Sequence, residues 1–315
     1  MDILSLGRSS KSNNREGEDR VFRSSQSAGR RTLMIVVTGA TGQLGRLVIS
    51  ALLKKVAAAD VVAAVRNVEK AKDIAALGVQ VRASDYNKPE SWDAALKGAD
   101  RVLLISSNEL GQRAKQHRVV VEAAKRSGVK LLAYTSVLRA DASVLGLAAE
   151  HKATEEAIRA SGIPYVLLRN GWYTENYDSV VKSAVNLGSI YGCASDGRIS
   201  AAARVDYAEA AAVVLGVDGH AGKTYELAGD TAFSLAELAS EIGRQAGKSI
   251  AYVNLSEPEY KKVLLGVGLP EPYAALLADS DTGISKGALY DESRQLSRLI
   301  GRNTTPISVT VKSAL

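Results

Sequence analysis

Short apolar runs alternate with segments of helical periodicity from residue 34 to residue 168. The pattern predicts strands at residues 34–37, 61–65, 79–83, 102–105, 130–135 and 165–168. It predicts helices with one apolar face at residues 43–56, 69–77, 89–96, 112–127 and 147–160. Short apolar strands separated by helices are typical of a parallel sheet covered on both faces. Right-handed crossovers then give a doubly wound α/β fold.

The rhythm changes after residue 169. Turn-rich segments at residues 186–192 and 195–198 are followed by predicted helices at 206–215, 235–246 and about 258–267. We therefore expect residues 34–169 to form the sheet domain. Residues 170–315 should form a smaller mixed α/β region, partly interleaved with the first domain, beside the carboxyl ends of the strands.

Residues 1–33 have a different composition, rich in Ser, Arg, Asn and Gly and without apolar periodicity. Such a segment cannot bury enough apolar surface to fold, so we predict a disordered tail or extension. It also lacks the apolar stretch of a secretory signal. Met34, the second of two methionines, opens the first predicted strand, which fits an original start at that residue.

Composition excludes several classes of protein. No run of about 18 apolar residues is present, so no membrane-spanning helix or membrane partner is expected. The net charge of +6 includes no basic run with interleaved aromatics, so no nucleic-acid partner is expected. A single cysteine and three scattered histidines exclude a disulfide framework and predict no metal site. A reducing compartment, the cytoplasm, is the expected location.

A glycine-rich turn, TGATGQLG, runs from Thr38 to Gly45 between the first strand and the first helix. Gly39 allows the tight turn, Gly42 lets the backbone approach a pyrophosphate, and Gly45 permits close packing of helix on strand. The alternative is a turn without a ligand. The turn predicts a Rossmann-type dinucleotide site whose contacts are Gly39, Thr41, Gly42, Gln43, Leu44 and Gly45.

Arg66 stands at the end of the second strand, where an NAD site usually has Asp or Glu on the ribose 2′-hydroxyl. A guanidinium binds a 2′-phosphate with two parallel hydrogen bonds, whereas a carboxylate repels it. Lys70 is close enough in sequence to help. Unless Arg66 is only a solvated surface residue, this position predicts NADPH as the cofactor.

Polar residues also follow the third and fourth strands. Asp85 is interpreted either as a contact to the adenine amino group or as a cap of the helix near Pro89. Ser106, Ser107 and Asn108 should line the cofactor near the nicotinamide ribose, because ligands lie beyond the carboxyl ends of parallel strands.

The usual proton donor of short-chain dehydrogenases is missing. Their Tyr-x-x-x-Lys motif would place Tyr at Leu147 and Lys at His151, while Lys152 lies about 100° around the helix. Reducing a ketone makes a strongly basic alkoxide that needs this donor. Reducing a quinone makes a phenolate-like oxygen with a proton affinity near that of Tyr, whose pKa is about 10. The absence favours quinones or similar electron-poor acceptors.

The remaining catalytic candidates follow the fifth and sixth strands. Residues 168–176 combine two aromatics with amides, which suits a wall for the nicotinamide and a flat ring, or else an aromatic anchor for the smaller region. His151 is either a structural histidine or part of a proton relay. The predicted catalytic residues are Tyr134, His151, Asn170 and Trp172.

Together these residues resemble the NmrA-like atypical short-chain dehydrogenases, from Met34 to the carboxyl end. The matching stretches are residues 38–45, 65–67, 103–107, 111–113, 116–118, 133–136, 145–147, 167–176, 225–230 and 277–286. Residues 106–118 and the segment around Trp172 look more like the quinone-reducing members than the triphenylmethane-dye reductases.

The resemblance implies direct hydride transfer from NADPH without a flavin. It implies an NADPH-binding domain at residues 34–169, a substrate-binding region after it, and a possible homodimer. It also implies cofactor contacts from Gly171, Trp172, Tyr173, Glu175 and Asn176. Because fold does not guarantee catalysis, two alternatives to a quinone reductase stay open: a non-catalytic NADP(H)-binding redox sensor or regulator of the NmrA type, and a dye reductase of the triphenylmethane type.

Overall fold

The computed structural model describes residues 33–315. The predicted disordered tail therefore lies outside the described residues, apart from Leu33. Residues 34–315 form one compact unit. A division of this unit at residue 169 remains a prediction.

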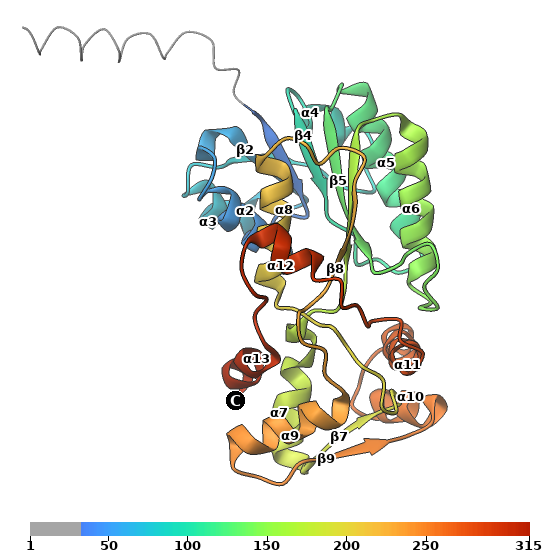
Figure 1. The fold of residues 1–315 in the computed structure, drawn as a ribbon. Coiled ribbons are helices and arrows are strands. Elements are labelled where there is room, and N and C mark those ends of the chain that lie inside the picture. Colours follow the sequence, from blue (N-terminus) through green and yellow to red (C-terminus); the bar gives the residue numbers. More distant parts are fainter. Residues whose placement is uncertain (1–32) are drawn as a thin grey trace, which may run out of the picture. The chain divides into compact units, whose positions relative to one another are not determined.

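A seven-stranded parallel sheet dominates this unit, with the strand order β3-β2-β1-β4-β5-β6-β8 (Figure 1). The doubly wound parallel sheet predicted from the sequence is thus confirmed. The order reverses direction between β1 and β4, which creates the switch point where such sheets bind ligands. The strands are β1 (Ile35–Thr38), β2 (Val61–Val65), β3 (Gln80–Ala83), β4 (Arg101–Leu104), β5 (Leu131–Val137), β6 (Tyr165–Asn170) and β8 (Thr224–Leu227).

Helices cover both faces of the sheet. On one face α2 (Gln43–Leu52) packs against α8 (Arg204–Gly216), and on the other α5 (Arg113–Arg126) packs against α6 (Ala148–Ser161). All residues of β1, β2, β4 and β5 are buried, as expected for strands covered on both faces. The shorter elements of this part are η1 (Ala58–Asp60), η2 (Val68–Ala71), α3 (Lys72–Ala75), α4 (Ser91–Ala95) and α12 (Gln295–Ile300). The short helix η3 (Thr174–Tyr177) follows β6 and contacts helices of the smaller layer.

A second, smaller layer holds the parallel pair β7 (Ser189–Gly192) and β9 (Ala251–Asn254). Its helices are α7 (Asp178–Leu187), α9 (Leu235–Ala246), α10 (Glu257–Gly266), α11 (Glu271–Ser285) and α13 (Ile307–Ala314). Ser234 begins α9 with a capping box, in which its side chain accepts from the Glu237 N–H and the Glu237 carboxylate accepts from the Ser234 N–H.

The sequence pattern located the helices α8, α9 and α10 but misjudged one segment and missed others. Residues 186–192, predicted as a turn, contain the end of α7 and all of β7. The four-residue strands β7, β8 and β9 were not predicted either. Each includes residues that are only partly buried or exposed, so none shows the continuous apolar run of a central strand.

Within residues 33–315, no helix is long and apolar enough to cross a lipid bilayer. Over the same range, no group of three or more His, Cys, Asp or Glu side chains is placed to hold a metal ion.

Candidate functional site

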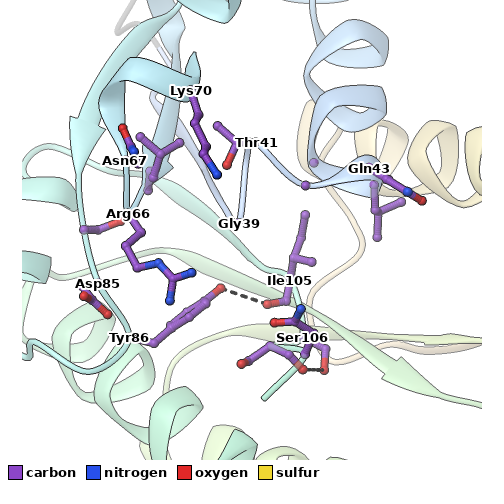
Figure 2. Close-up of a pocket in the computed structure, with 18 of the residues that line it drawn as sticks. Gly39, Thr41, Gln43, Arg66, Asn67, Lys70, Asp85, Tyr86, Ile105 and Ser106 are labelled. Atoms are coloured by element: carbon purple, nitrogen blue, oxygen red, sulfur yellow. Dashed lines mark hydrogen bonds between the residues drawn. The ribbon is translucent and has the colours of Figure 1, made fainter. Parts of the chain in front are cut away.

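A pocket of about 690 Å³ opens at the carboxyl ends of β1, β2, β3 and β4 (Figure 2). It includes the switch point between β1 and β4, and its volume is in the range of sites that bury a small molecule. The sequence-predicted residues that line it are Gly39, Thr41, Gly42, Gln43, Leu44, Gly45, Arg66, Asp85, Ser106, Ser107 and Asn108. The structure therefore gathers loops that are up to 70 positions apart in the sequence.

The glycine turn has the backbone geometry of a phosphate cradle. Gly39 has φ +57°, a left-handed conformation that favours glycine, and its carbonyl accepts from the Gly42 N–H at 2.9 Å. A Cβ on Gly45 would lie 2.5 Å from the Gly39 carbonyl oxygen, so no other residue fits there. Gly42 begins α2 without a side-chain cap, so the first amides of the helix are available to an anion.

A closed set of hydrogen bonds fixes the floor of the pocket. The Ile105 N–H donates to Thr38 Oγ1 at 2.9 Å, the two hydroxyls of Thr38 and Tyr86 are 2.7 Å apart, and Tyr86 donates to the Ile105 carbonyl at 3.0 Å. Tyr86 also stacks on the buried Trp92, with ring centroids 5.4 Å apart. Burial raises the pKa of Tyr86, so its hydroxyl remains a donor. The ends of β1 and β4 are thereby held in place.

Cationic side chains stand at the end of the pocket that follows β2. Arg66 is exposed at the end of β2, and Figure 2 shows its guanidinium directed across the pocket while the Lys70 amine points inward. Arg46, in α2, donates to the Lys70 carbonyl at 2.8 Å and pairs with Asp73, which ties η2 to the glycine turn. Arg66 and Lys70 supply the donors and positive charge that a 2′-phosphate needs, and no Asp or Glu occupies the position of Arg66.

Asp85 has a local structural partner. Its Oδ1 accepts from the Asn87 N–H at 2.9 Å, which stabilises the turn after β3. The helix α4 itself begins after Glu90, so Asp85 is not its N-cap residue. A contact from Asp85 to adenine remains a prediction.

Helix α5 holds the segment 106–109 with buried polar side chains. The Ser107 N–H donates to His117 Nε2 at 2.9 Å, and Arg113 Nε donates to the Ser107 carbonyl at 2.7 Å. Because Nε2 of His117 accepts, its Nδ1 carries the proton and donates to Thr154 Oγ1 at 3.0 Å. Gln116 accepts from the Ser107 hydroxyl. Side chains of α5 therefore hold in place the segment after β4 that forms one wall of the pocket.

Tyr134 and His151 are brought together in the interior. The Tyr134 hydroxyl lies 2.8 Å from His151 Nδ1, and both side chains are buried, Tyr134 completely. Burial raises the pKa of Tyr134. Ser106 lines the pocket, and its N–H donates to Thr135 Oγ1, next to Tyr134 in β5, at 2.9 Å. Lys152, the next residue of α6, is exposed to solvent.

We expect both interior histidines to stay neutral from about pH 5.5 to 8. Burial and the nearby Arg113 lower the pKa of His117 to about 3, and burial first, then Arg113 and His117, lower the pKa of His151 well below 6.5. The imidazole C2–H resonances of both should not titrate in this window. In the unfolded chain both histidines become protonated as the pH falls below about 6.5, whereas in the folded protein they stay neutral. Each should therefore lower the free energy of unfolding by about 1.4 kcal/mol for every pH unit below about 6.5, and for His117 this continues down to its folded pKa.

Urea unfolding between about pH 7.5 and 5 measures the net slope, to which Asp281, whose pKa burial raises to about 6, contributes with the opposite sign. The same measurement on Asp281→Asn removes that contribution. Titration of either resonance with a midpoint near 6.5 in the folded protein would contradict the expectation.

The predicted residues at the end of β6 and directly after it make contacts elsewhere in the structure. Asn170 is buried and donates to the Tyr173 hydroxyl at 3.3 Å, and its Oδ1 has no hydrogen-bond partner. The Gly171 N–H donates to the Leu227 carbonyl, and Trp172 packs partly buried against the apolar cluster of the smaller layer. These residues are not among those that line the pocket at β1 to β4.

Tyr173 and Glu175 contact the start of α8. The Arg204 guanidinium lies 4.9 Å from the centre of the Tyr173 ring. Both carboxylate oxygens of Glu175 accept from the Arg204 N–H, at 2.9 and 3.0 Å. Asn176 is exposed. Cofactor contacts from Gly171, Trp172, Tyr173, Glu175 and Asn176 remain predictions.

Several residues of the site were not assigned a role from the sequence. Tyr86, Ile105 and Glu109 line the pocket, while Gln116 and His117 support its wall. A signal for the last two was present, because they are polar residues on the face of α5 that continues with Val120 and Ala124. Nothing in the local pattern indicated that Tyr86 and Ile105 would meet, since that contact depends on the strand order β3-β2-β1-β4.

Comparison with known proteins places this geometry among relatives. The model of the NmrA-like family matches residues 31–307. Quinone oxidoreductase 2 of Escherichia coli strain K12 is 53% identical over 278 residues, which cover 88% of this chain and 97% of that protein.

Solved structures agree with this placement. The crystal structure of the NADPH-dependent quinone oxidoreductase of Escherichia coli in complex with NADPH matches with a TM-score of 0.88 and 53% identity, over 89% of this chain and 99% of the other. The triphenylmethane reductase of Citrobacter sp. in complex with NADP(H) matches with a TM-score of 0.86 and 43% identity, over 89% of this chain and all of the other.

Proposed function

Because this chain belongs to the NmrA-like family, we propose that it is an NADPH-dependent oxidoreductase that reduces quinones by direct hydride transfer without a flavin. The observation that carries the proposal is Arg66 at the ribose end of a pocket built on a glycine turn at a helix N-terminus. The similarity to a quinone oxidoreductase over most of both chains supports the substrate class.

The residues present fit NADPH. The open backbone at Gly39, Gly42 and Gly45 leaves room for a pyrophosphate against α2, and Arg66 with Lys70 supplies charge for a 2′-phosphate. When bound, NADPH supplies a hydride to an electron-poor acceptor. We assign further contacts to Thr41, Gln43, Leu44, Asp85 and the segment 106–108, and, as the resemblance implies, to Gly171, Trp172, Tyr173, Glu175 and Asn176.

The chain's own part in the chemistry is to position the reactants and manage one proton. A phenolate-like oxygen has a modest proton affinity, so a neutral hydroxyl or water suffices as its donor. Ser106 lines the pocket, its N–H donates to Thr135 Oγ1 beside Tyr134 in β5, and the Tyr134 hydroxyl hydrogen-bonds to His151. We assign to Tyr134 and His151 the role of a proton relay, and to Asn170 and Trp172 the orientation of the ring.

A stopped-flow screen of acceptors tests the proposal. Oxidation of NADPH is followed with benzoquinone, a naphthoquinone, a triphenylmethane dye and an aliphatic ketone, and repeated with NADH. We expect turnover with the quinones, much less with NADH as donor, and none with the ketone. Turnover of the dye but not of the quinones would favour the dye-reductase alternative, and tight NADPH binding without turnover would favour a regulator.

We also propose that the protein works in the cytoplasm and forms a homodimer, as the resemblance and the single cysteine led us to expect. In the same scheme residues 34–169 bind the cofactor and most of residues 170–315 bind the acceptor. Sedimentation velocity measures the oligomeric state, and a monomer at micromolar concentration would remove the dimer from the scheme.

A further inference from the structure

Glu109 places a carboxylate next to the arginine assigned to the 2′-phosphate. Its Oε1 lies 3.4 Å from Arg66 Nη1, and both residues line the pocket. Figure 2 shows the Arg66 guanidinium reaching over the pocket toward the side of Tyr86 and Ile105, away from the strand that carries it. The side chains of Arg66 and Glu109 are 72% and 42% exposed, so this ion pair is weak.

The position of Glu109 is nevertheless set by buried groups. Its Oε2 accepts from Gln116 Nε2 at 2.6 Å, and its N–H donates to Ser107 Oγ at 3.2 Å. Gln116 is 1% exposed and also donates to Asn87 Oδ1 at 3.1 Å. These two hydrogen bonds restrict the conformations of Glu109 and keep its carboxylate beside Arg66. The pocket therefore carries a positioned negative charge beside Arg66.

We propose that Glu109 is a specificity-determining residue, whose carboxylate competes with the 2′-phosphate of the cofactor for Arg66 and limits the preference for NADPH over NADH. The inference rests on the proposed function, because it takes NADPH as the ligand. A phosphate monoester has nearly two negative charges at neutral pH. A phosphate bound by Arg66 meets a like charge from Glu109, whereas a ribose with a free 2′-hydroxyl does not. Because the Arg66–Glu109 ion pair is weak, the 2′-phosphate displaces the carboxylate from Arg66, but the affinity for NADPH is lower than it would be without Glu109.

Binding of two nucleotide fragments tests this without turnover. Calorimetry compares adenosine 2′,5′-bisphosphate with adenosine 5′-diphosphate on the wild-type protein, on Glu109→Gln and on Glu122→Gln. Glutamine retains an oxygen that accepts from Gln116, so the anchor of residue 109 is preserved. Glu122→Gln, at an exposed position of α5, the helix that follows Glu109, changes the net charge equally and serves as the control.

We expect Glu109→Gln to bind the 2′-phosphorylated fragment about two- to fivefold more tightly. Its affinity for the diphosphate and the affinities of the control should change by less than about 1.5-fold. The gain should shrink as the salt concentration rises from about 0.05 to 0.5 M. It should also shrink in an Arg66→Ala background, where no guanidinium is left to compete for.

An unchanged or weaker affinity of Glu109→Gln for the 2′-phosphorylated fragment would overturn the inference, and so would an equal gain for both fragments. Glu109→Ala provides a second removal of the charge, and its affinities should follow those of Glu109→Gln. A wild-type protein that binds the phosphorylated fragment but turns over no acceptor would refute the proposed function alone, and leave the role of Glu109 standing.

Discussion

Replacing Arg66 by alanine should weaken NADPH binding by about 10- to 100-fold and NADH binding by less than about threefold. The loss corresponds to about 1.5–3 kcal/mol, the range for hydrogen bonds to a charged group. In the proposed assignment the 2′-phosphate is the cofactor group that binds this guanidinium, since the pyrophosphate is assigned to the glycine turn. The preference for NADPH should therefore collapse while cofactor binding as such persists.

Fluorescence or calorimetric titration with both nucleotides measures the two affinities. Arg118→Ala, an exposed arginine of α5, is the matched control and should change neither. Equal losses for NADPH and NADH in Arg66→Ala would mean that Arg66 supports the pocket as a whole, and the assignment of the 2′-phosphate to it would be wrong.

Replacing Arg169 by alanine should destabilise the protein by about 3–5 kcal/mol. Arg169 donates to both oxygens of Glu155, at 2.9 and 2.8 Å, and these side chains are 5% and 1% exposed. Removing the arginine leaves a buried carboxylate with Ser136 and Arg159 as its remaining partners. A buried charge that loses its ion-pair partner is costly because water cannot replace that partner.

Urea unfolding at neutral pH measures the change. Arg159→Ala removes the half-exposed partner of the same carboxylate and should cost about 1 kcal/mol or less. The double change Arg169→Met with Glu155→Leu removes both buried charges and should cost less than Arg169→Ala alone. If the free energy of unfolding of Arg169→Ala lies within about 1 kcal/mol of the wild-type value, the Arg169–Glu155 pair is solvated in solution and the prediction is wrong.

The same pair bears on the proposed acceptor site. Arg169 directly precedes Asn170 in β6, and Ser136 lies opposite Arg169 on β5. Its Nη1 also donates to Asp141 and Glu226, so one guanidinium joins three segments at the ends of β5, β6 and β8. The geometry of Asn170 and Trp172 therefore depends on a network that the sequence did not reveal, because its members are spread over residues 136 to 226.

The sequence by itself determined six of the seven strands of the sheet, the glycine turn and the charge at the end of β2. These features are local, since a strand buried on both faces needs a continuous apolar run and a tight turn at a helix start needs glycine at fixed spacing. Because the end of β2 could be located from the sequence, Arg66 could be compared with the Asp or Glu that usually stands there in NAD-binding sites.

The tertiary structure alone decided which distant side chains meet. The contacts of Tyr86 with Ile105, of His117 with Ser107 and of Glu109 with Arg66 each join segments brought together by strand order and helix packing. The short strands β7, β8 and β9 likewise depend on pairing with a neighbouring strand, because their own residues show too little apolar pattern to predict a strand. Hydrogen bonds and ion pairs depend on a few ångströms in space, and the spacing of residues along a chain does not encode that distance.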